Sequence, residues 1–438
     1  MIIYFTTLGC PKNFNDTEVA KGILVENSYT ITDDIEEADV IVVNTCGFIN
    51  DAKVESINQI IQLMPYKEEG KKLVVSGCLT KRYAKELMEE MPEVDLFIGV
   101  NEYAKLPELL KDLDNRKALV EEWDGCPLGA EPRKYDDNPY SATLKIAEGC
   151  NNRCTYCAIP DIRGGFRSKP MDLIIEEAKL LADKGCKELI LIAQDLTLYG
   201  YDLYGEYKLS DLVRQLAKID KIKWIRLMYC YEDRINDELI KTIKEEAKVC
   251  KYLDIPIQHI SNGVLKAMHR RSTSDSIKTT LAKLRKEIPD INIRTTLIIG
   301  FPGESEEDFE ELLDFVEDEK FERLGCFAYS MEDNTPAAKM EKQIDEDVKQ
   351  ERVDAIMRRQ LDISLEHNKE KIGRVLDVLV EEVDDTKDNS YIGRTQYDAP
   401  EIDNSVIFTS LRALKAGDFL RVRIIDAFDY DLVGTEEA

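Results

Sequence analysis

The chain has 438 residues, of which 43% are hydrophobic and 33% are charged. This composition is typical of a folded globular protein of two to four domains, and it excludes the collagen-like, disordered and membrane-embedded classes. The net charge of −27 disfavours a non-specific nucleic-acid binder, because such proteins need a basic face. No apolar run is long enough to span a bilayer and the start lacks a basic secretory segment, so we expect a cytoplasmic protein with no membrane partner.

The first 122 residues alternate between strand-like and helix-like patterns. Three apolar runs are typical of buried strands, at 2–7, 40–43 and 73–75. Two amphipathic stretches are typical of helices, at 18–25 and 55–64. Such alternation predicts an open, mostly parallel α/β domain over residues 1–122. Residues 123–140 are rich in Asp, Gly and Pro, which predicts a linker.

A second α/β series follows the linker. Its six candidate strands are residues 142–147, 188–194, 224–229, 252–257, 293–299 and 324–329. Most of them are followed by a helical pattern, so we expect six βα units, which form a partial barrel with fewer strands than the eight of a closed one. A charged helical stretch at 345–369 ends this predicted domain, which spans residues 141–370.

The last predicted domain, residues 371–438, has a different period. Residues 419–424 (FLRVRI) alternate apolar and charged side chains, as half-buried strands do. Short strands separated by Asp, Asn and Gly turns predict a small all-β barrel. This segment carries 8 basic and 15 acidic side chains, a net charge of −7, although Arg421 and Arg423 could line a local basic groove.

Cys150, Cys154 and Cys157 follow the first barrel strand in C-x3-C-x2-C spacing. Three thiolates on a short loop can bind three irons of a cubane cluster and leave the fourth iron open to another ligand. The alternatives are buried core cysteines or a zinc knuckle. The chain has only three His, which leaves sulfur as the main source of metal ligands.

Cys10, Cys46 and Cys78 each come just after one predicted strand of the first domain. Because the carboxyl ends of parallel strands meet at one edge of a sheet, we expect a second three-thiolate site there. Each of them alone would more often be a buried core cysteine. The other five cysteines show no pattern and are assigned to core or chance, namely Cys126, Cys186, Cys230, Cys250 and Cys326.

Gln194 and Gly300 are weaker candidates for contacts with a nucleoside cofactor. Each lies at the predicted carboxyl end of a barrel strand, where barrel sites are built, but a capping amide and a turn glycine explain them equally well. Residues 302–308 are interpreted as a turn and an acidic helix start. Residues 269–271 (HRR) are interpreted as a solvated basic patch, which could also meet the backbone of a substrate. Residues 381–385 are interpreted as a solvated hairpin edge.

The whole chain resembles the radical S-adenosylmethionine (SAM) methylthiotransferases, which consist of an N-terminal cluster domain, a radical SAM barrel and a C-terminal TRAM domain. Besides the cysteine loop, the resemblance rests on residues 8–13 (LGCPKN), 44–49 (NTCGFI), 157–160 (CAIP), 162–164 (IRG), 254–259 (DIPIQH), 300–304 (GFPGE) and 398–403 (DAPEID). The LGCPKN, CAIP and IRG segments are similar to the branch that modifies a ribosomal protein rather than the branch that modifies tRNA. Asn404 departs from the glycine that relatives commonly carry, but Asn tolerates the same turn backbone.

The resemblance implies two [4Fe-4S] clusters. SAM would bind the open iron of the cluster on Cys150, Cys154 and Cys157 and yield a deoxyadenosyl radical, while the cluster on Cys10, Cys46 and Cys78 would carry sulfur and a separate SAM would supply the methyl group. The implied substrate is an aspartate β-carbon of small-subunit ribosomal protein S-twelve, free or in the ribosome. A flavodoxin or ferredoxin would supply electrons, and no side-chain acid or base is assigned.

Two other functions are weighed against this one. A tRNA adenosine methylthiotransferase would share both cysteine sites, but the acidic last domain would have to approach phosphates. A non-enzymatic iron–sulfur carrier would normally supply four cysteines to a cluster, whereas this loop supplies three.

Overall fold

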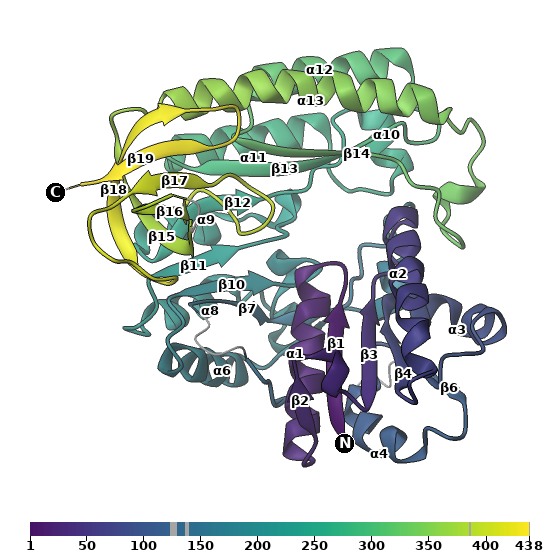
Figure 1. Cartoon of the computed structure of the whole chain (residues 1–438). Helices are drawn as coiled ribbons and strands as arrows, with labels where there is room; N and C mark the ends of the chain where they lie inside the picture. Colours follow the sequence, from purple (N-terminus) through teal and green to yellow (C-terminus); the bar gives the residue numbers. More distant parts are fainter. Residues whose placement is uncertain (123–128, 136–139, 385–386, 438) are drawn as a thin grey trace.

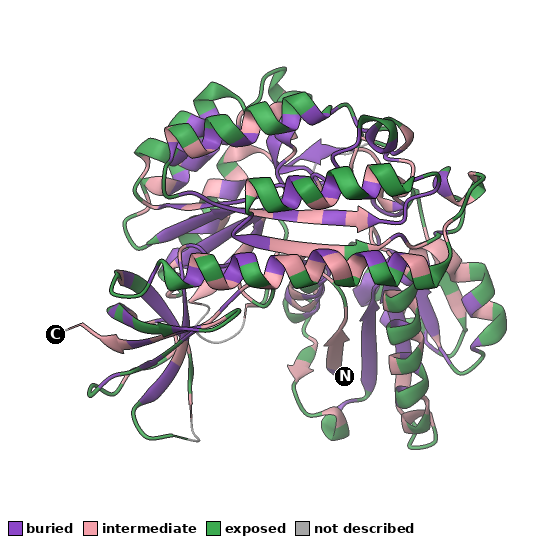
Figure 2. Ribbon diagram, turned by 90° about the horizontal axis from the view of Figure 1, so that it is seen from above, coloured by how far each residue is buried: buried purple, intermediate pink, exposed green. Residues whose placement is uncertain are grey.

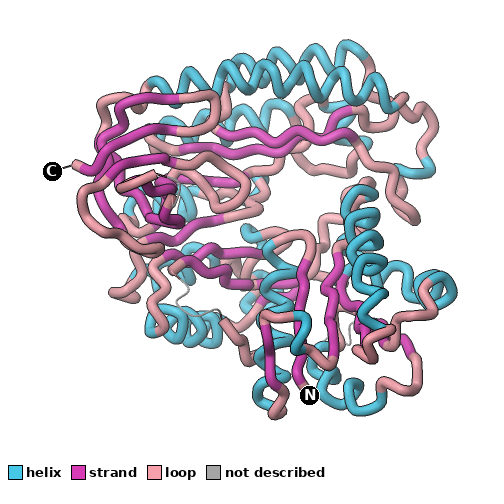
Figure 3. The backbone as a smooth tube through the Cα atoms, viewed as in Figure 1, coloured by secondary structure: helices cyan, strands magenta, loops and turns pink. Residues whose placement is uncertain are grey.

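The computed structural model describes residues 1–122, 129–135, 140–384 and 387–437. These residues form two open six-stranded parallel sheets covered by helices and one closed five-stranded barrel (Figure 1). The tube view separates the same three groups of strands (Figure 3). The predicted fold class is therefore confirmed as an open α/β domain, a partial barrel and a small all-β barrel. Among the described residues, no helix is long and apolar enough to cross a bilayer.

The first sheet has the strand order β2-β1-β3-β4-β5-β6, and every neighbouring pair is parallel. Its strands are β1 (Ile2–Thr7), β2 (Thr30–Thr32), β3 (Val40–Thr45), β4 (Lys72–Gly77), β5 (Leu96–Ile98) and β6 (Lys117–Leu119), and its helices are α1 (Pro11–Glu26), α2 (Asn50–Leu63), α3 (Cys78–Glu90) and α4 (Leu106–Leu109). The central strand β3 is buried throughout, as expected for a strand covered on both faces. The predicted strand at 2–7 matches β1 because its apolar run has clear ends.

The second sheet has the order β14-β13-β12-β11-β10-β7 and is also entirely parallel. Its strands are β7 (Ser141–Lys145), β10 (Glu188–Ile192), β11 (Trp224–Leu227), β12 (Val249–Asp254), β13 (Asn292–Ile299) and β14 (Arg323–Ala328). The helices are α5 (Ile159–Arg163), α6 (Met171–Asp183), α7 (Tyr201–Tyr204), α8 (Leu209–Ala217), α9 (Asp237–Glu245), α10 (Asn262–Ala267), α11 (Ser274–Glu287), α12 (Glu306–Glu319) and α13 (Glu346–Lys369). The prediction of six βα units is confirmed. The strands are mostly buried and the outer faces of the long helices are exposed (Figure 2).

We call each six-stranded sheet, together with its helices and loops, a sheet unit. In the second sheet unit a short antiparallel pair, β8 (Ala147–Glu148) and β9 (Arg167–Ser168), follows β7. This pair brackets the segment that carries Cys150, Cys154 and Cys157. The segment is therefore fixed at both of its ends, next to the carboxyl edge of the sheet.

The closed barrel lies at the opposite end of the second sheet, where the strands begin (Figure 1). It consists of β15 (Val375–Val383), β16 (Ser390–Thr395), β17 (Val406–Thr409), β18 (Phe419–Ala427) and β19 (Leu432–Glu436). Arg394 and Arg226 both donate to Glu188, the first residue of β10. Burial alone would raise the pKa of Glu188, but the two guanidinium groups lower it to about 2. The barrel is therefore attached through a buried ionic cluster.

The interpretation of residues 381–385 as a solvated hairpin edge is wrong for Glu381. Its carboxylate accepts a hydrogen bond from Arg394 (2.6 Å), so it belongs to the same buried ionic cluster. A run of acidic residues gives no sign of this, because the cation that pairs with Glu381 lies on the next strand. Residue 385 lies outside the described residues, as does part of the predicted linker.

Lys371 provides a test of the attachment between the sheet and the closed barrel. It is only 5% exposed, and burial together with Arg323 lowers its pKa to about 8. Between pH 8 and pH 10.5, the ordinary pKa of a lysine side chain, Lys371 binds a proton in the unfolded chain but not in the folded chain. The free energy of unfolding therefore rises with pH across this window. We expect Lys371→Met to raise the free energy of unfolding at pH 7 by roughly 1–3 kcal/mol. This gain should disappear towards pH 10.5.

Thermal unfolding midpoints of both proteins at pH 7 and pH 10 measure the effect. Lys369→Met is the matched control, because Lys369 is exposed and its replacement should change little at either pH. A gain for Lys371→Met that is equal at both pH values would contradict the assignment to the buried charge.

Candidate cofactor site

Cys150, Cys154 and Cys157 lie on a tight loop between β8 and α5. The loop starts at Gly149, whose φ of +78° and close approach to the backbone of residues 164–165 leave no space for a side chain. The Cys157 N–H donates to the Cys154 carbonyl (3.1 Å). The loop therefore closes on itself, which keeps the three cysteines on one short turn.

Residues from neighbouring strand ends hold this loop in place. Asn152 Nδ2 donates to the Asp195 carboxylate (2.9 Å), and Arg234 donates to Asp195 (2.5 Å) and to the side-chain oxygen of Asn152 (3.0 Å). The Cys154 sulfur lies 3.1 Å from the Tyr231 hydroxyl. Because these partners follow β10 and β11, the loop is positioned by the rigid edge of the sheet.

The thiols of the loop interact electrostatically. Burial raises the pKa of the Cys150 thiol to about 11 and raises that of Cys157 further. Cys154 adds to both increases because two neighbouring thiolates repel each other. Such thiols lose their protons when a metal binds, and a donor set made only of sulfur is typical of iron–sulfur clusters.

The N-terminal cysteines follow three neighbouring strands of the first sheet. Cys10 comes after β1, Cys46 after β3 and Cys78 after β4, and these strands are adjacent in the order β1-β3-β4. Pro11 favours the first position of a helix and starts α1 directly after Cys10, while Cys78 is itself the first residue of α3. All three cysteines therefore lie at one edge of the sheet, as the sequence predicts.

Two glycines bring these three turns together. A Cβ at Gly9 would lie 2.7 Å from the Cβ of Cys46 and 3.1 Å from its sulfur. A Cβ at Gly47 would lie 2.7 Å from the Cα of Leu79, the residue after Cys78. Only glycine allows approaches this close, so both positions are required for the cysteines to converge.

The thiols of the N-terminal set also affect one another. Burial raises the pKa of Cys46, and the neighbouring Cys10 raises it further. Burial raises the pKa of Cys78 to about 12, against the opposing effect of Arg163, and Cys10 and Cys46 add to the increase. The three thiols therefore form one electrostatically linked group.

The two cysteine sets lie next to each other. Cys78 packs in one buried cluster with Ala158 and Ile162, which belong to the segment directly after Cys157, and α3 contacts α5. Arg163, the last residue of α5, donates to the Cys78 sulfur at 3.3 Å. This proximity is not visible in the sequence, because the two sets belong to different sheets.

Within the described residues, no three side chains of His, Cys, Asp or Glu are grouped as they would be around a single metal ion. A four-iron cluster has a different requirement, because each of its cysteines binds a separate iron. The six cysteines are free thiols in two sets of three. Their roles as cluster ligands stay predictions.

Gln194 and Gly300, the candidates for contacts with a nucleoside cofactor, both have hydrogen-bond partners within the protein. Gln194 Nε2 donates to Glu148 (2.5 Å), but the buried Oε1 of Gln194 has no partner. The Gly300 N–H donates to Glu304 (2.8 Å), and the side chain of Lys349 fills the space where a Gly300 side chain would stand. Packing therefore explains Gly300 without a ligand, whereas Gln194 retains a free acceptor. Contact with a nucleoside stays a prediction for both.

Two further buried acceptors without partners lie near the same strand ends and were missed in the sequence. They are Oε1 of Glu232, after β11, and Oε1 of Gln258, after β12. Gln258 has a φ of +70°, which is uncommon for a residue other than glycine. The segment 254–259 carries part of the family resemblance, but nothing in its pattern singles out Gln258.

The interpretation of residues 269–271 as a solvated basic patch is wrong for Arg270. Its guanidinium is buried, donates to Glu232 (3.1 Å) and lies 4.4 Å from the centre of the Tyr231 ring. Three adjacent basic side chains look solvated in a sequence because their distant partners are not visible there. Arg270 instead supports the residues around the Cys154 sulfur.

Cys186, Cys230 and Cys250 are buried, Cys326 is half-buried, and Cys126 lies outside the described residues. The predicted acidic helix start is confirmed, since α12 begins at Glu306 with a capping box formed by Ser305 and Asp308.

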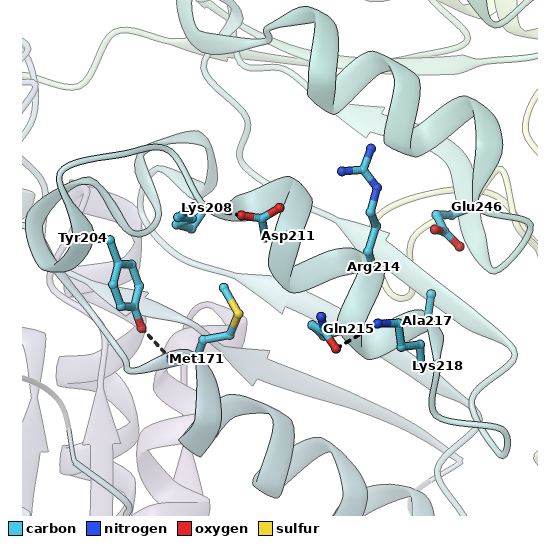
Figure 4. Close-up of a pocket in the computed structure, with 9 residues that line it drawn as sticks. All are labelled: Met171, Tyr204, Lys208, Asp211, Arg214, Gln215, Ala217, Lys218 and Glu246. Atoms are coloured by element: carbon cyan, nitrogen blue, oxygen red, sulfur yellow. Dashed lines mark hydrogen bonds and ion pairs between the residues drawn. The ribbon is translucent and has the colours of Figure 1, made fainter.

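A separate hollow lies on the outer helices of the second sheet unit (Figure 4). It has a volume of about 570 Å³ and is lined mainly by residues of α8 and the turn before it, with Met171 and Tyr204 at one side. The Tyr204 hydroxyl accepts a hydrogen bond from the Met171 N–H (3.0 Å), and Lys208 pairs with Asp211 (3.1 Å). The hollow contains none of the six cysteines, so we do not assign it to the cofactor site.

Family models match most of the chain. The radical SAM superfamily matches residues 144–316, the uncharacterized protein family UPF0004 matches residues 2–99, and the TRAM domain matches residues 372–436. The radical SAM match covers the C-x3-C-x2-C loop, and the UPF0004 match covers Cys10, Cys46 and Cys78.

Curated relatives match the chain over nearly its full length. It is 51% identical to "Ribosomal protein uS12 methylthiotransferase RimO" of Desulforamulus reducens, over 98% of both chains. It is 49% identical to the protein of the same name from Clostridioides difficile, over 99% of this chain and 98% of that protein.

Among solved structures, the radical SAM methyltransferase TsrM of Kitasatospora setae, bound to cobalamin and a [4Fe-4S] cluster, matches with a TM-score of 0.57. The match covers 77% of this chain and 73% of that chain at 14% identity. At this level of identity the likeness shows the shared fold alone.

Proposed function

We propose that this chain, which belongs to the RimO family of ribosomal protein uS12 methylthiotransferases, adds a methylthio group to the β-carbon of an aspartate in uS12, the small-subunit ribosomal protein S-twelve. The chain is a radical SAM transferase. The observation that carries the proposal is the pair of adjacent three-cysteine sets, one from each sheet, in a chain about half identical to RimO proteins. The substrate, the second cluster and a cytoplasmic location are parts of the proposal.

The loop after β8 fits the cofactors of the radical SAM family. Cys150, Cys154 and Cys157 would hold a [4Fe-4S] cluster and leave one iron open for SAM. When bound, this cofactor pair supplies a radical that removes hydrogen from an unactivated C–H bond. The unpartnered acceptors Gln194 Oε1 and Gln258 Oε1 offer hydrogen-bond acceptors to the amino or hydroxyl groups of SAM.

The N-terminal set fits a second cluster that carries the sulfur. It supplies only thiols, its members lie close together, and Cys78 packs against α5. Sulfur held there would be next to the site where the substrate carbon is activated, so the protein's contribution is to hold the two sites close together. A flavodoxin or ferredoxin would supply the electrons.

The charges on the closed barrel favour a protein substrate over tRNA. Its net charge of −7 would repel phosphates, and Arg423, one of the two residues that could line a basic groove, forms a two-pronged ion pair with Glu437 (2.8 and 2.5 Å). Arg412 also forms an ion pair, with Glu436. An acidic surface attracts basic proteins, and ribosomal proteins are strongly basic. The closed barrel lies where the strands of the second sheet begin, whereas the cysteine sets lie at the carboxyl ends of the strands. The closed barrel would therefore act in docking the substrate and not in the chemistry.

We therefore expect the full-length protein to bind uS12 in a salt-sensitive manner, and to show no measurable affinity for tRNA. Titrations with each partner at low and moderate salt measure this. Neutralising three exposed acidic residues of the barrel, with Asp377→Asn, Glu382→Gln and Asp429→Asn, should weaken uS12 binding several-fold at low salt and little at moderate salt.

The matched control for this prediction neutralises three exposed acids of the first sheet unit, with Glu26→Gln, Asp33→Asn and Glu89→Gln. It changes the net charge by the same amount and should leave uS12 binding nearly unchanged. Tighter binding to tRNA than to uS12 would favour the tRNA alternative.

Mass spectrometry of ribosomal proteins and tRNA from cells that lack this chain tests the function directly. The methylthio group of uS12 should be lost, while the methylthio groups of tRNA should remain. Purified protein with SAM, a reductant, sulfide as the sulfur source and uS12 should restore the group. Loss from tRNA, with uS12 unchanged, would reject the proposed substrate.

A further inference from the structure

Arg163 lies between the two cysteine sets. Its side chain is 3% exposed, although it ends a short helix only six residues after Cys157. The guanidinium points to the first sheet unit, where it donates to the Asn13 side-chain oxygen (2.7 Å), the Asp16 carboxylate (2.6 Å) and the Cys78 sulfur (3.3 Å). One side chain of the second sheet unit thus contacts Cys78 of the N-terminal set and two residues beside that set.

The same guanidinium also forms a hydrogen bond within the second sheet unit. It donates to Glu148 (3.2 Å), the last residue of β8, directly before the turn into the Cys150 loop. Arg163 therefore forms a continuous hydrogen-bonded connection from the start of one cysteine loop to a cysteine of the other set. A planar guanidinium can make these bonds at once, whereas an ammonium group has a single donor centre.

The charged side chains around Arg163 form one buried network. The carboxylates of Asp16 and Glu148 both pair also with Lys145 (2.7 and 3.2 Å). Two cations thus share two anions, and the Arg167 guanidinium lies nearby, donating to the Arg163 carbonyl (2.9 Å). Arg163 is the cation of this network that donates to the Cys78 sulfur, in surroundings with little solvent.

We propose that Arg163 is a positioning residue that joins the two cysteine sets into one site and whose positive charge raises the reduction potential of the cluster held by the N-terminal set. This inference rests on the proposed second cluster. Hydrogen bonds to ligand sulfurs and net charge set the potential of an iron–sulfur cluster, and a buried cation favours its reduced, more negative state.

The test uses full-length protein in which Cys150, Cys154 and Cys157 are replaced by Ala, so that only the N-terminal set can hold a cluster. Arg163→Met removes both the charge and the hydrogen bonds, and Arg163→Lys keeps the charge but has a single donor centre in place of the planar guanidinium. A redox titration followed by electron paramagnetic resonance should show a more negative midpoint potential for Arg163→Met and a smaller shift for Arg163→Lys.

A second readout uses the protein with all six cysteines. There, both variants should cleave more SAM molecules per methylthiolated uS12, because the N-terminal set is no longer held against α5. A purely structural role would lower both products together and leave this ratio unchanged.

Arg133 is the matched control. Its side chain is 2% exposed and bridges the same two parts of the chain, pairing with Glu18 of α1 and Glu177 of α6, and within the described residues it donates to no cysteine of either set. Arg133→Met should lower the unfolding midpoint as Arg163→Met does, without moving the potential. An unmoved potential in Arg163→Met, or an equal shift in Arg133→Met, would overturn the inference. If the protein with Cys150, Cys154 and Cys157 replaced by Ala binds no iron while Arg163 is intact, the second cluster itself is rejected, and the inference with it.

Discussion

Replacing Cys150, Cys154 and Cys157 together by Ala should abolish the reductive cleavage of SAM. These thiols are the proposed cluster ligands on the loop after β8, and without them no open iron would be present to bind SAM. Release of 5′-deoxyadenosine, measured by mass spectrometry under strict exclusion of oxygen, should fall to background. The iron content after reconstitution should fall from about eight to about four per chain, because the N-terminal set keeps its cluster.

Three buried cysteines outside both sets provide the control for this experiment. Cys186, Cys230 and Cys250 belong to the packed interior, and none of them interacts with the thiols of the loop. Replacing these three by Ala removes the same number of thiols and should leave the iron content and SAM cleavage intact, at some cost in stability. Wild-type protein that binds zinc, or that saturates near four irons, would reject the two-cluster interpretation.

The sequence was most informative where a local pattern determines the structure. The apolar run at 2–7 matches β1, and the six strands predicted for the partial barrel are all present, because each run is bounded by polar or turn residues. The convergence of Cys10, Cys46 and Cys78 was also predictable. It requires only that strands β1, β3 and β4 be parallel neighbours, so that their carboxyl ends meet.

The sequence was least informative where a side chain is paired across large separations. Arg270 looked solvated because Glu232 is 38 residues away, and Glu381 looked solvated because Arg394 lies on another strand. Arg163 is a further case, since its partner Asp16 is 147 residues away in the other sheet unit. A buried charge needs such a partner, but composition and periodicity cannot identify it.

Replacing Cys10, Cys46 and Cys78 together by Ala should separate the two steps of the proposed reaction. Cleavage of SAM needs only the loop after β8, so 5′-deoxyadenosine should still form when SAM and a reductant are supplied. Methylthiolated uS12 should fall to background, because no sulfur is held next to α5. Both products can be measured in the same reaction by mass spectrometry, so protein that has simply unfolded would lose both.

The volume left by Cys78 is the main complication of this experiment, because its side chain packs against Ala158 and Ile162. A second triple variant with Ser in place of Ala keeps most of that volume and changes the ligand chemistry, so the two variants should agree. If either variant made normal amounts of methylthiolated uS12, the N-terminal cysteines would be packing residues. The sulfur would then have to reach the substrate without them, and the proximity of the two sets would need a different explanation.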